Sequence, residues 1–183
     1  QRSLTIALRF GESERDTEAN QYTCLAHIYA HLGQYKKASN YFNKCIAITK
    51  QTRAARIEGY ALWGLGKVYL AKRNYSDAIN LFNLSLNIAI NTQDFDRQNR
   101  ETLLSHAYLY ANNLEESRKF AHEACQHDYP RTKHSARLIY GIVSARLGDI
   151  QKAYDLFEEA ILAANNLLHI TPKFYTAKYT RSA

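Results

Sequence analysis

A cysteine and two histidines near the start of the sequence have the spacing of metal ligands on a helix. Cys24, His27 and His31 are spaced i, i+3 and i+7, and thiolate and imidazole groups on one helical face could bind Zn²⁺ or Cu. A structural zinc site takes four ligands, and the fourth would have to be His106 or a group outside the chain. We therefore favour packing for Cys24 and a polar surface role for the histidines, and we expect no metal and no cofactor.

Two other sets of residues have the composition of catalytic groups. Cys45 and His106 could be a nucleophile and its base, but Cys45 occupies a predicted core position, where a buried and inert thiol is expected. The adjacent glutamates at 115–116 and 158–159 suit a solvated helix face. No glycine-rich phosphate loop, HExxH or Gly-x-Ser-x-Gly element occurs. The sequence therefore predicts that the protein is not an enzyme.

The composition of the 183 residues, 46% hydrophobic and 22% charged, is that of a globular protein. No stretch approaches the ~20 apolar residues of a membrane span, and the first residues do not form a signal peptide. Three irregularly spaced cysteines favour a reducing, cytoplasmic location. The net charge of +7 suits an anionic partner, but the basic residues are spread along the chain. Nucleic-acid binders concentrate such charge in one stripe, so a nucleic-acid partner is disfavoured.

The elements that position these side chains form a repeated pair of helices. In the second copy, Leu62, Leu65 and Tyr69 lie on one helical face, and Phe82 and Leu86 lie on another after a break at 72–74. Equivalent patterns follow one another at spacings of 40, 39 and 36 residues. Only two prolines and seven glycines interrupt the chain. These features predict an all-α protein built from helical hairpins.

Three positions of the hairpin are small in every copy. They hold Ala26, Gly66, Ser105 and Gly141; Ala38, Ala78, Ser117 and Ala153; and Cys45, Ser85, Ala124 and Ala160. A small side chain lets two helix backbones approach closely, and a large one would overpack the contact at a cost of roughly 1–3 kcal/mol. We expect Gly66 and Ala78 to close their own hairpin, and Ser85 to help seat the next one.

The turn between the two helices has its own signature. Gly33, Asn112 and Gly148 can end a helix in the left-handed conformation that most residues resist. The second copy has Arg73 at this position and Asn74 after it. Either Asn74 adopts the left-handed conformation, or Arg73 does so at a cost of about 1 kcal/mol.

The segments LWGLGKVYLAKRNYSDAINLF, LGQYKKASNYF and YGIVSARLGDIQKAYDLFEEAI resemble the tetratricopeptide repeat (TPR) family. The resemblance covers about residues 18–165, and the long period is similar to a variant found in bacterial signalling and multidomain proteins. It implies an all-α, right-handed superhelical solenoid of antiparallel helix hairpins, with four full repeats and a partial repeat at each end. We expect the repeats at 18–53, 57–94, 97–128 and 132–168. Residues 1–15 would end a preceding repeat, 171–183 would begin a further one, and the chain would be part of a larger protein.

The resemblance also implies a concave groove lined by the first helix of each repeat. The side chains expected to line it are Asn20, Thr23, His27, His31, Tyr60, Trp63, Lys67, Asn99, Thr102, His106, Tyr110 and Arg146. Trp63 would be either a groove anchor or a packing residue between first helices. The Lys/Asn/Arg cluster with which some family members grip a C-terminal carboxylate is absent, because Thr23, His27, Thr102 and His106 stand at the matching positions. This disfavours a chaperone-tail adaptor.

These features predict a protein-interaction scaffold that binds a peptide or a partner protein in the groove, because aromatic residues and Arg tend to dominate such interfaces. The alternative is a ligand-sensing, regulatory segment of a larger signalling ATPase, protease or transcription regulator. Direct nucleic-acid binding is a weaker alternative. The first two differ in whether an effector domain flanks the array.

Overall fold

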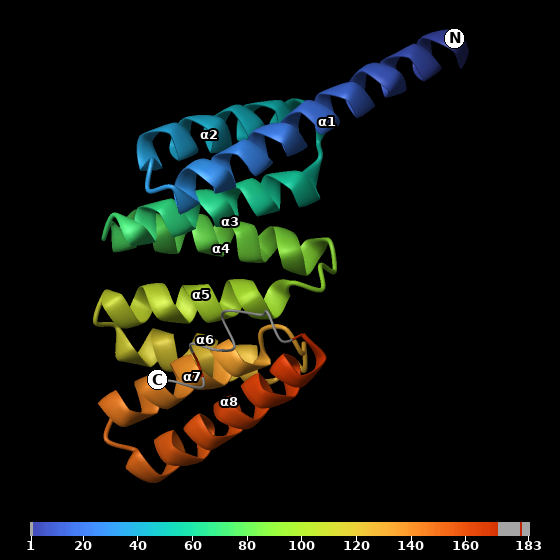
Figure 1. Ribbon diagram of the computed structural model, residues 1–183. Helices are drawn as coiled ribbons and strands as arrows, with labels where there is room; N and C mark the ends of the chain where they lie inside the picture. The colour runs from blue at the N-terminus through green and yellow to red at the C-terminus, as the bar shows by residue number, and fades with distance from the viewer. Residues whose placement is uncertain (1, 172–179, 181–183) are drawn as a thin grey trace. The chain divides into compact units, whose positions relative to one another are not determined.

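The computed structural model describes the backbone of residues 2–171 and 180, and the side chains of residues 11, 13–171 and 180. These residues contain α-helices and no β-strand (Figure 1). The helices are α1 (Arg2–His31), α2 (Tyr35–Thr52), α3 (Ala55–Ala71), α4 (Tyr75–Asn91), α5 (Arg97–Tyr110), α6 (Leu114–Cys125), α7 (Lys133–Arg146) and α8 (Ile150–Ile170). None of the helices in this part of the chain is long and apolar enough to cross a membrane.

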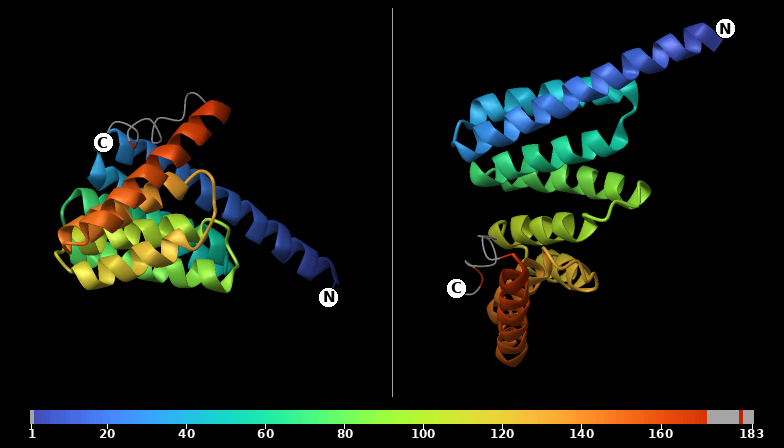
Figure 2. Two further views of the ribbon diagram at one scale, coloured as in Figure 1. Left: turned by 90° about the horizontal axis from the view of Figure 1, so that it is seen from below. Right: turned by 45° about the vertical axis from the view of Figure 1, so that its right-hand side comes forward.

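Consecutive helices pair as antiparallel hairpins, which confirms the all-α, TPR-like class of fold. The pairs are α1 with α2, α3 with α4, α5 with α6, and α7 with α8, and Figure 2 shows them from two further directions. The chain divides into two compact units, Gln1–Asp94 and Phe95–Ala183. In the first unit α1 also contacts α3, and in the second α5 contacts α7. Within each unit, therefore, the first helices of neighbouring hairpins lie side by side.

The small residues are the places where the helices meet, as predicted. All twelve are buried. A Cβ atom added to Gly66 would lie 2.6 Å from the Phe82 ring, and one added to Gly141 would lie 2.5 Å from the Phe157 ring. Ser85 differs from its expected role, because its hydroxyl donates to the Gly59 carbonyl at 2.8 Å. It therefore fastens α4 to α3 of its own hairpin rather than seating the next one.

The turn after each first helix contains a left-handed residue. Gly33 has φ 70°, Asn112 has φ 60° and Gly148 has φ 87°. In the second copy Arg73 takes this conformation, with φ 61°. Asn74 instead caps α4, where its side-chain oxygen accepts from the Asp77 amide at 3.4 Å. The chain therefore keeps the turn geometry in this copy at the expense of a strained arginine.

The two ends of the chain relate differently to the predicted repeat boundaries. α1 runs without a break from Arg2 to His31, and so passes through residues 15–18, where a preceding repeat was expected to end and the first full repeat to begin. At the other end, Thr171 terminates α8. The further helix predicted for 171–183 otherwise lies outside the described residues, apart from Thr180.

Candidate functional site

Four of the predicted groove residues come together where α1 and α3 lie side by side. The His27 ring, from α1, lies 5.8 Å from the Trp63 ring of α3, centroid to centroid. One helical turn further along α3, the Lys67 ammonium lies 4.5 Å from the centroid of the Trp63 ring, which is a cation–π contact. His31 follows His27 by one turn and lines the same pocket. We call His27, His31, Trp63 and Lys67 the α1–α3 site.

A glycine that the sequence analysis did not single out makes room for this site. A Cβ atom added to Gly64 would lie 2.3 Å from Cζ of Phe42 and 3.0 Å from Cε1 of His27. Phe42 is fully buried and meets the His27 ring edge-on at 5.1 Å. Gly64 therefore lets the Phe42 and His27 rings approach the backbone of α3. Its signal in the sequence is a second glycine two positions before Gly66, on a face that the repeat pattern leaves unassigned.

The site opens into a small pocket of about 150 Å³. Its polar lining includes His31, Lys67 and Tyr35, the last of which was not predicted, and its apolar lining includes Ala30 and Val68. The pocket therefore offers hydrogen-bond donors above an apolar wall. This combination fits one side chain that has a polar end and an apolar stem.

The surroundings of His27 favour the uncharged form of its imidazole. Burial lowers the pKa of His27 below its usual value, and the nearby positive groups Lys67 and His31 lower it further. A neutral imidazole presents one donor and one acceptor, whereas the imidazolium presents two donors. Lys67 therefore adds a positive charge beside an imidazole whose uncharged form is favoured.

The structure places the other predicted residues of the first unit elsewhere. Asn20 is exposed on α1. Thr23 is buried, and its hydroxyl donates to the Ala19 carbonyl at 3.1 Å and contacts Sγ of Cys45 at 3.1 Å. Thr23 is therefore a core residue, and its assignment to a groove surface is corrected. The hydroxyl of Tyr60 lies 3.5 Å from Oδ1 of Asp94, so this ring is directed toward the end of the second hairpin.

Cys45 is the buried and inert thiol that was predicted. It is fully buried, and burial raises its pKa. Among the residues that the structure describes, no three His, Cys, Asp or Glu side chains lie close enough together to hold a metal ion.

In the second unit, two predicted residues form a pair and two belong to the framework. The His106 and Tyr110 rings lie 4.7 Å apart on α5; Tyr110 is exposed, and burial lowers the pKa of His106. Thr102 is buried and donates to the Gln98 carbonyl at 2.7 Å, so its groove assignment is also corrected. Arg146 of α7 donates to Oδ1 of Asn112 at 2.8 Å, which ties α7 to the turn after α5. Asn99 is half-buried on α5.

A buried polar network of the second unit was missed by sequence reasoning. Gln98 is almost fully buried. Its amide nitrogen donates to the carbonyls of Ala124 at 2.8 Å and His127 at 2.7 Å. Its oxygen accepts from the Tyr129 amide at 3.2 Å and the Thr132 hydroxyl at 2.8 Å. A single glutamine therefore shapes the loop between α6 and α7.

A buried carboxylate lies one turn along α5 from Gln98. Glu101 is fully buried, and its two oxygens lie 2.6 Å from Nε of Arg97 and 3.1 Å from Nε2 of His127. The only signal in the sequence was the polar run RQNRE at the start of α5, which periodicity alone would assign to solvent. Both residues hold the framework of the second unit.

A sequence model of the tetratricopeptide repeat family matches residues 1–91. The chain belongs to the tetratricopeptide repeat family. No curated protein sequence matches this TPR chain. Solved structures similar to it include BtubC (BKLC) from P. vanneervenii, with a TM-score of 0.75 at 16% identity over 84% of this chain and 65% of that one. The chain thus spans slightly less than two thirds of the length of BtubC.

Two further TPR-like structures are described as peptide-binding. The Rap conjugation gene regulator of plasmid pLS20, solved in complex with the Phr* peptide, has a TM-score of 0.73 at 18% identity, over 83% of this chain and 43% of that one. YrrB, described as a TPR protein with an unusual peptide-binding site, has a TM-score of 0.58 at 15% identity, over 88% of this chain and 91% of that one. At these identities the likeness is one of fold.

Proposed function

We propose that the chain is a protein-interaction scaffold that binds a peptide, or an extended segment of a partner protein, at the α1–α3 site. The observation that carries this proposal is the grouping of a cation and two imidazoles around one small pocket, with the Trp63 ring in contact with both the cation and His27. Aromatic side chains with adjacent hydrogen-bonding groups dominate the binding energy of protein interfaces. The peptide bound by the Rap regulator and the peptide-binding site of YrrB support the same role for this fold.

The two roles expected for Trp63, a groove anchor and a packing residue between first helices, are compatible in this proposal. Its ring is half-buried against His27 of the neighbouring first helix, so it packs between hairpins. The ring also has Lys67 over it, and Lys67 lines the pocket. Trp63 thus positions Lys67 beside the pocket, and Lys67 supplies the charge that selects the polar end of one ligand side chain. His106 and Tyr110 are candidates for a separate contact in the second unit.

The proposal can be tested with the fluorescence of Trp63, which is the only tryptophan of the chain. Peptides are selected against the protein from a random library displayed on phage, and a selected peptide is then titrated while Trp63 emission is followed. We expect saturable binding that Lys67→Gln weakens about tenfold, as loss of one partly buried charged contact predicts. The control is Tyr154→Ala, which removes a ring that is 62% exposed on α8.

Three outcomes bear on the proposal. If selected peptides change Trp63 emission and lose affinity only in the Lys67 variant, the site is supported. If Lys67→Gln and Tyr154→Ala bind equally well, the pocket is not the binding site. If no peptide is enriched, the peptide-binding role is refuted for this surface.

A regulatory segment is the second candidate function, and the likeness to the Rap regulator is the observation that favours it. In this case a peptide bound at the α1–α3 site would control an effector domain. It predicts a nucleotide-binding, DNA-binding or caspase-like domain in the sequence that flanks these residues. A flanking sequence that contains only further repeats would argue for the simple scaffold.

A further inference from the structure

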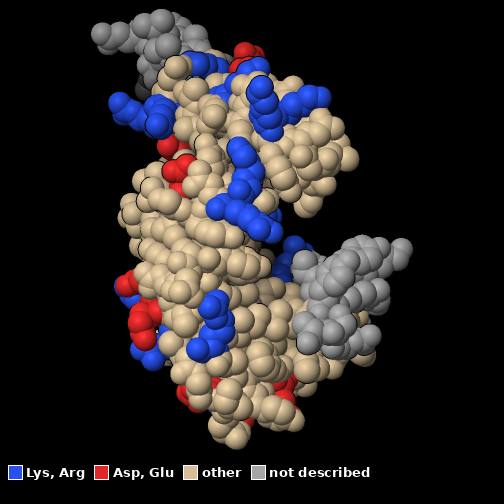
Figure 3. Space-filling view, turned by 90° about the vertical axis from the view of Figure 1, so that its left-hand side faces the viewer, with Lys and Arg blue, Asp and Glu red and all other residues tan. Residues whose placement is uncertain are grey.

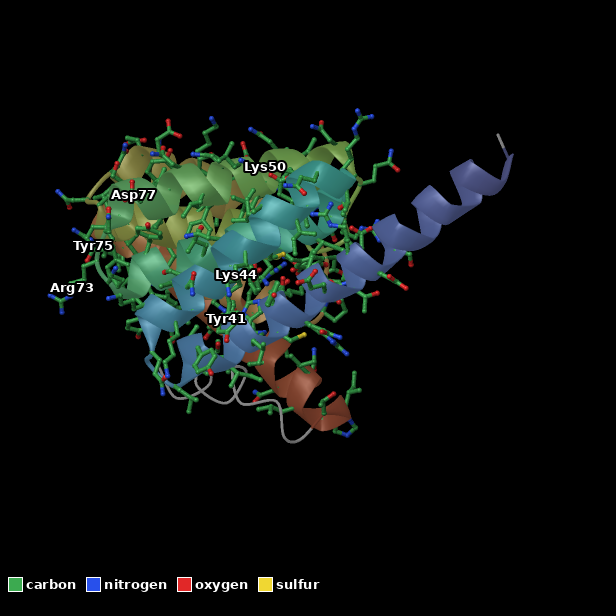
Figure 4. All side chains as sticks on the ribbon, turned by 90° about the horizontal axis from the view of Figure 1, so that it is seen from above. Tyr41, Lys44, Lys50, Arg73, Tyr75 and Asp77 are labelled. Atoms are coloured by element: carbon green, nitrogen blue, oxygen red, sulfur yellow. The ribbon has the colours of Figure 1, made fainter. Side chains whose placement is uncertain are left out.

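The first hairpin carries a second distinctive surface, formed by tyrosines and lysines of α1 and α2. Its members are Tyr22 and Tyr29 of α1, and Lys37, Tyr41 and Lys44 of α2, which we call the tyrosine–lysine face. Figure 4 shows Tyr41 and Lys44 beside one another on α2, with Lys50 further along the same helix. None of these residues lines the pocket of the α1–α3 site.

The three rings are packed on one another. The Tyr29 and Tyr41 rings are parallel, with an interplanar angle of 2° and centroids 5.4 Å apart. The Tyr22 ring lies 5.8 Å from that of Tyr41 at an angle of 33°. Such a stack fixes the ring positions, because each tyrosine has only two side-chain torsions to restrain.

Lys44 lies near two of these rings and Lys37 lies near the third. The Lys44 ammonium is 5.5 Å from the Tyr22 centroid and 5.4 Å from the Tyr41 centroid, and the Lys37 ammonium is 5.2 Å from the Tyr29 centroid. Contact with the electron-rich ring faces favours these positions over the many others open to a lysine. Less side-chain entropy is then lost on binding, so the two cations are preorganised for binding an anion.

The charge of α2 is uniform in sign. The helix contains four lysines and neither Asp nor Glu. Beside the face, Lys36, Lys37, Ser39, Asn40 and Asn43 line a shallow hollow of about 470 Å³. In the space-filling view of Figure 3, blue Lys and Arg side chains gather over the upper part of the visible surface. This side of α2 therefore presents donors and positive charge.

Tyr41 and Lys44 are particular to the first hairpin, whereas Tyr29 matches Tyr69 and Tyr108 of the later repeats. The positions that match Tyr41 in the later repeats hold Leu81, Phe120 and Leu156, and those that match Lys44 hold Leu84, Glu123 and Glu159. The rings themselves belong to hairpin packing, because Tyr22, Tyr29 and Tyr41 contact the core of the first unit and the Tyr29–Tyr41 stack recurs as Tyr108 and Phe120. What packing does not require is the basic residue at the Lys44 position, and a recognition role accounts for it.

We propose that the tyrosine–lysine face docks an acidic segment of a partner protein, a run of Asp and Glu residues that lies along α2. Carboxylates complement the fixed ammonium groups of Lys37 and Lys44. Single-stranded nucleic acid fits less well, because its binding sites offer open aromatic faces for stacking, and each of these rings already contacts another tyrosine and a lysine. This role is additional to peptide binding at the α1–α3 site.

One carboxylate limits the extent of the face. A hydrogen bond with Glu18, together with the charge of Glu18, raises the pKa of the Tyr22 hydroxyl. The Tyr22 end of the stack is therefore less attractive to anions. The acidic segment is placed over Lys37 and Lys44, toward the start of α2.

The test measures fluorescence anisotropy with two defined probes, a fluorescein-labelled peptide of Glu and Gly residues and a thymidine oligonucleotide of similar length. The peptide is expected to bind with an affinity that falls on addition of salt and falls about tenfold in the Lys37→Gln/Lys44→Gln double variant. Tyr41→Leu, which introduces the residue type of the matching position of α4, is expected to weaken binding less, because the ammonium remains.

A lysine with the same local contact provides the control. Lys119 lies 5.4 Å from the Phe120 centroid on α6, but its neighbour Glu116 lies 4.0 Å away in an ion pair. Lys119→Gln and Tyr154→Ala, which removes an exposed ring of α8, are expected to leave the binding of the acidic peptide unchanged. Circular dichroism verifies that each variant is folded.

The other outcomes overturn the proposal. Equal peptide binding by the double variant and the unmodified protein would show that the tyrosine–lysine face does not bind the acidic peptide. An equal loss of affinity in Lys119→Gln would show that the acidic peptide is attracted to the net positive charge of the protein and not to this face. Tighter binding of the oligonucleotide than of the peptide, lost in the double variant, would assign the face to nucleic acid. Because these readouts do not involve Trp63, they are separate from the test of the α1–α3 site.

Discussion

Replacing Gln98 with methionine should destabilise the second unit by about 3 kcal/mol, because methionine keeps the length of the side chain but removes all four hydrogen bonds. The Ala124 carbonyl would keep a longer bond from the His127 amide at 3.4 Å, so loss of the Gln98 bond at this buried position costs about 0.5–1 kcal/mol net. The other three bonds are partly buried, so water replaces them in part, and each contributes about 0.5–1 kcal/mol net.

The measurement is urea unfolding followed by circular dichroism, with tyrosine fluorescence as a second probe to test for two-state behaviour. Gln126→Met is the matched control, because Gln126 is an exposed glutamine of the same loop whose side chain meets His122 at 3.2 Å. It is expected to change the free energy of unfolding by less than about 0.5 kcal/mol. Values for the two variants that agree within error would refute the idea that Gln98 holds the α6–α7 loop.

Three further predictions concern the first unit. Gly66→Ala should lower the free energy of unfolding by about 1–3 kcal/mol despite the better helix propensity of alanine, because the new Cβ would lie 2.6 Å from the buried Phe82 ring; thermal unfolding measures this. Arg73→Gly should raise stability by up to about 1 kcal/mol, because glycine adopts the φ of 61° without strain, and an unchanged or lower midpoint in urea would contradict it. The folded-state pKa of His27 lies below its unfolded value, so its contribution to stability is complete above the unfolded pKa and is lost as pH falls through the interval down to the folded pKa. In NMR titrations the pKa of His27 should rise in Lys67→Gln. An unchanged pKa would show that the charge of Lys67 does not lower it.

The repeat itself was predictable because its signal is local and is present four times. Positions such as Gly66 and Ala78 are small since two backbones meet there, and each copy of the sequence carries the same requirement. Arg73 shows that the turn geometry is also the same in every copy. The turn keeps its left-handed residue even where the sequence supplies no glycine or asparagine.

The candidate site was predictable only in part. Trp63 and Lys67 are four residues apart on one helix, so their contact follows from helical geometry. The approach of His27 to Trp63 joins two hairpins, and it depends on the missing side chain of Gly64. Helical spacing also placed Thr23 with His27, although the structure buries the first against Cys45 and leaves the second half-exposed. How many residues of a helix face are buried depends on the neighbouring helix, and the periodicity of one helix carries no information about that neighbour.

The sequence by itself determined the helical hairpins, their small contact positions and the turns between them, because each of these is imposed by interactions within a few helical turns. Only the tertiary structure decided which side chains meet across hairpins. It brought His27 to Trp63, directed Arg146 to the turn at Asn112, and buried Gln98 as the template of a loop. These are contacts between residues about 30–40 positions apart. Their geometry depends on how whole hairpins pack, and a repeated pattern specifies that packing without specifying its polar exceptions.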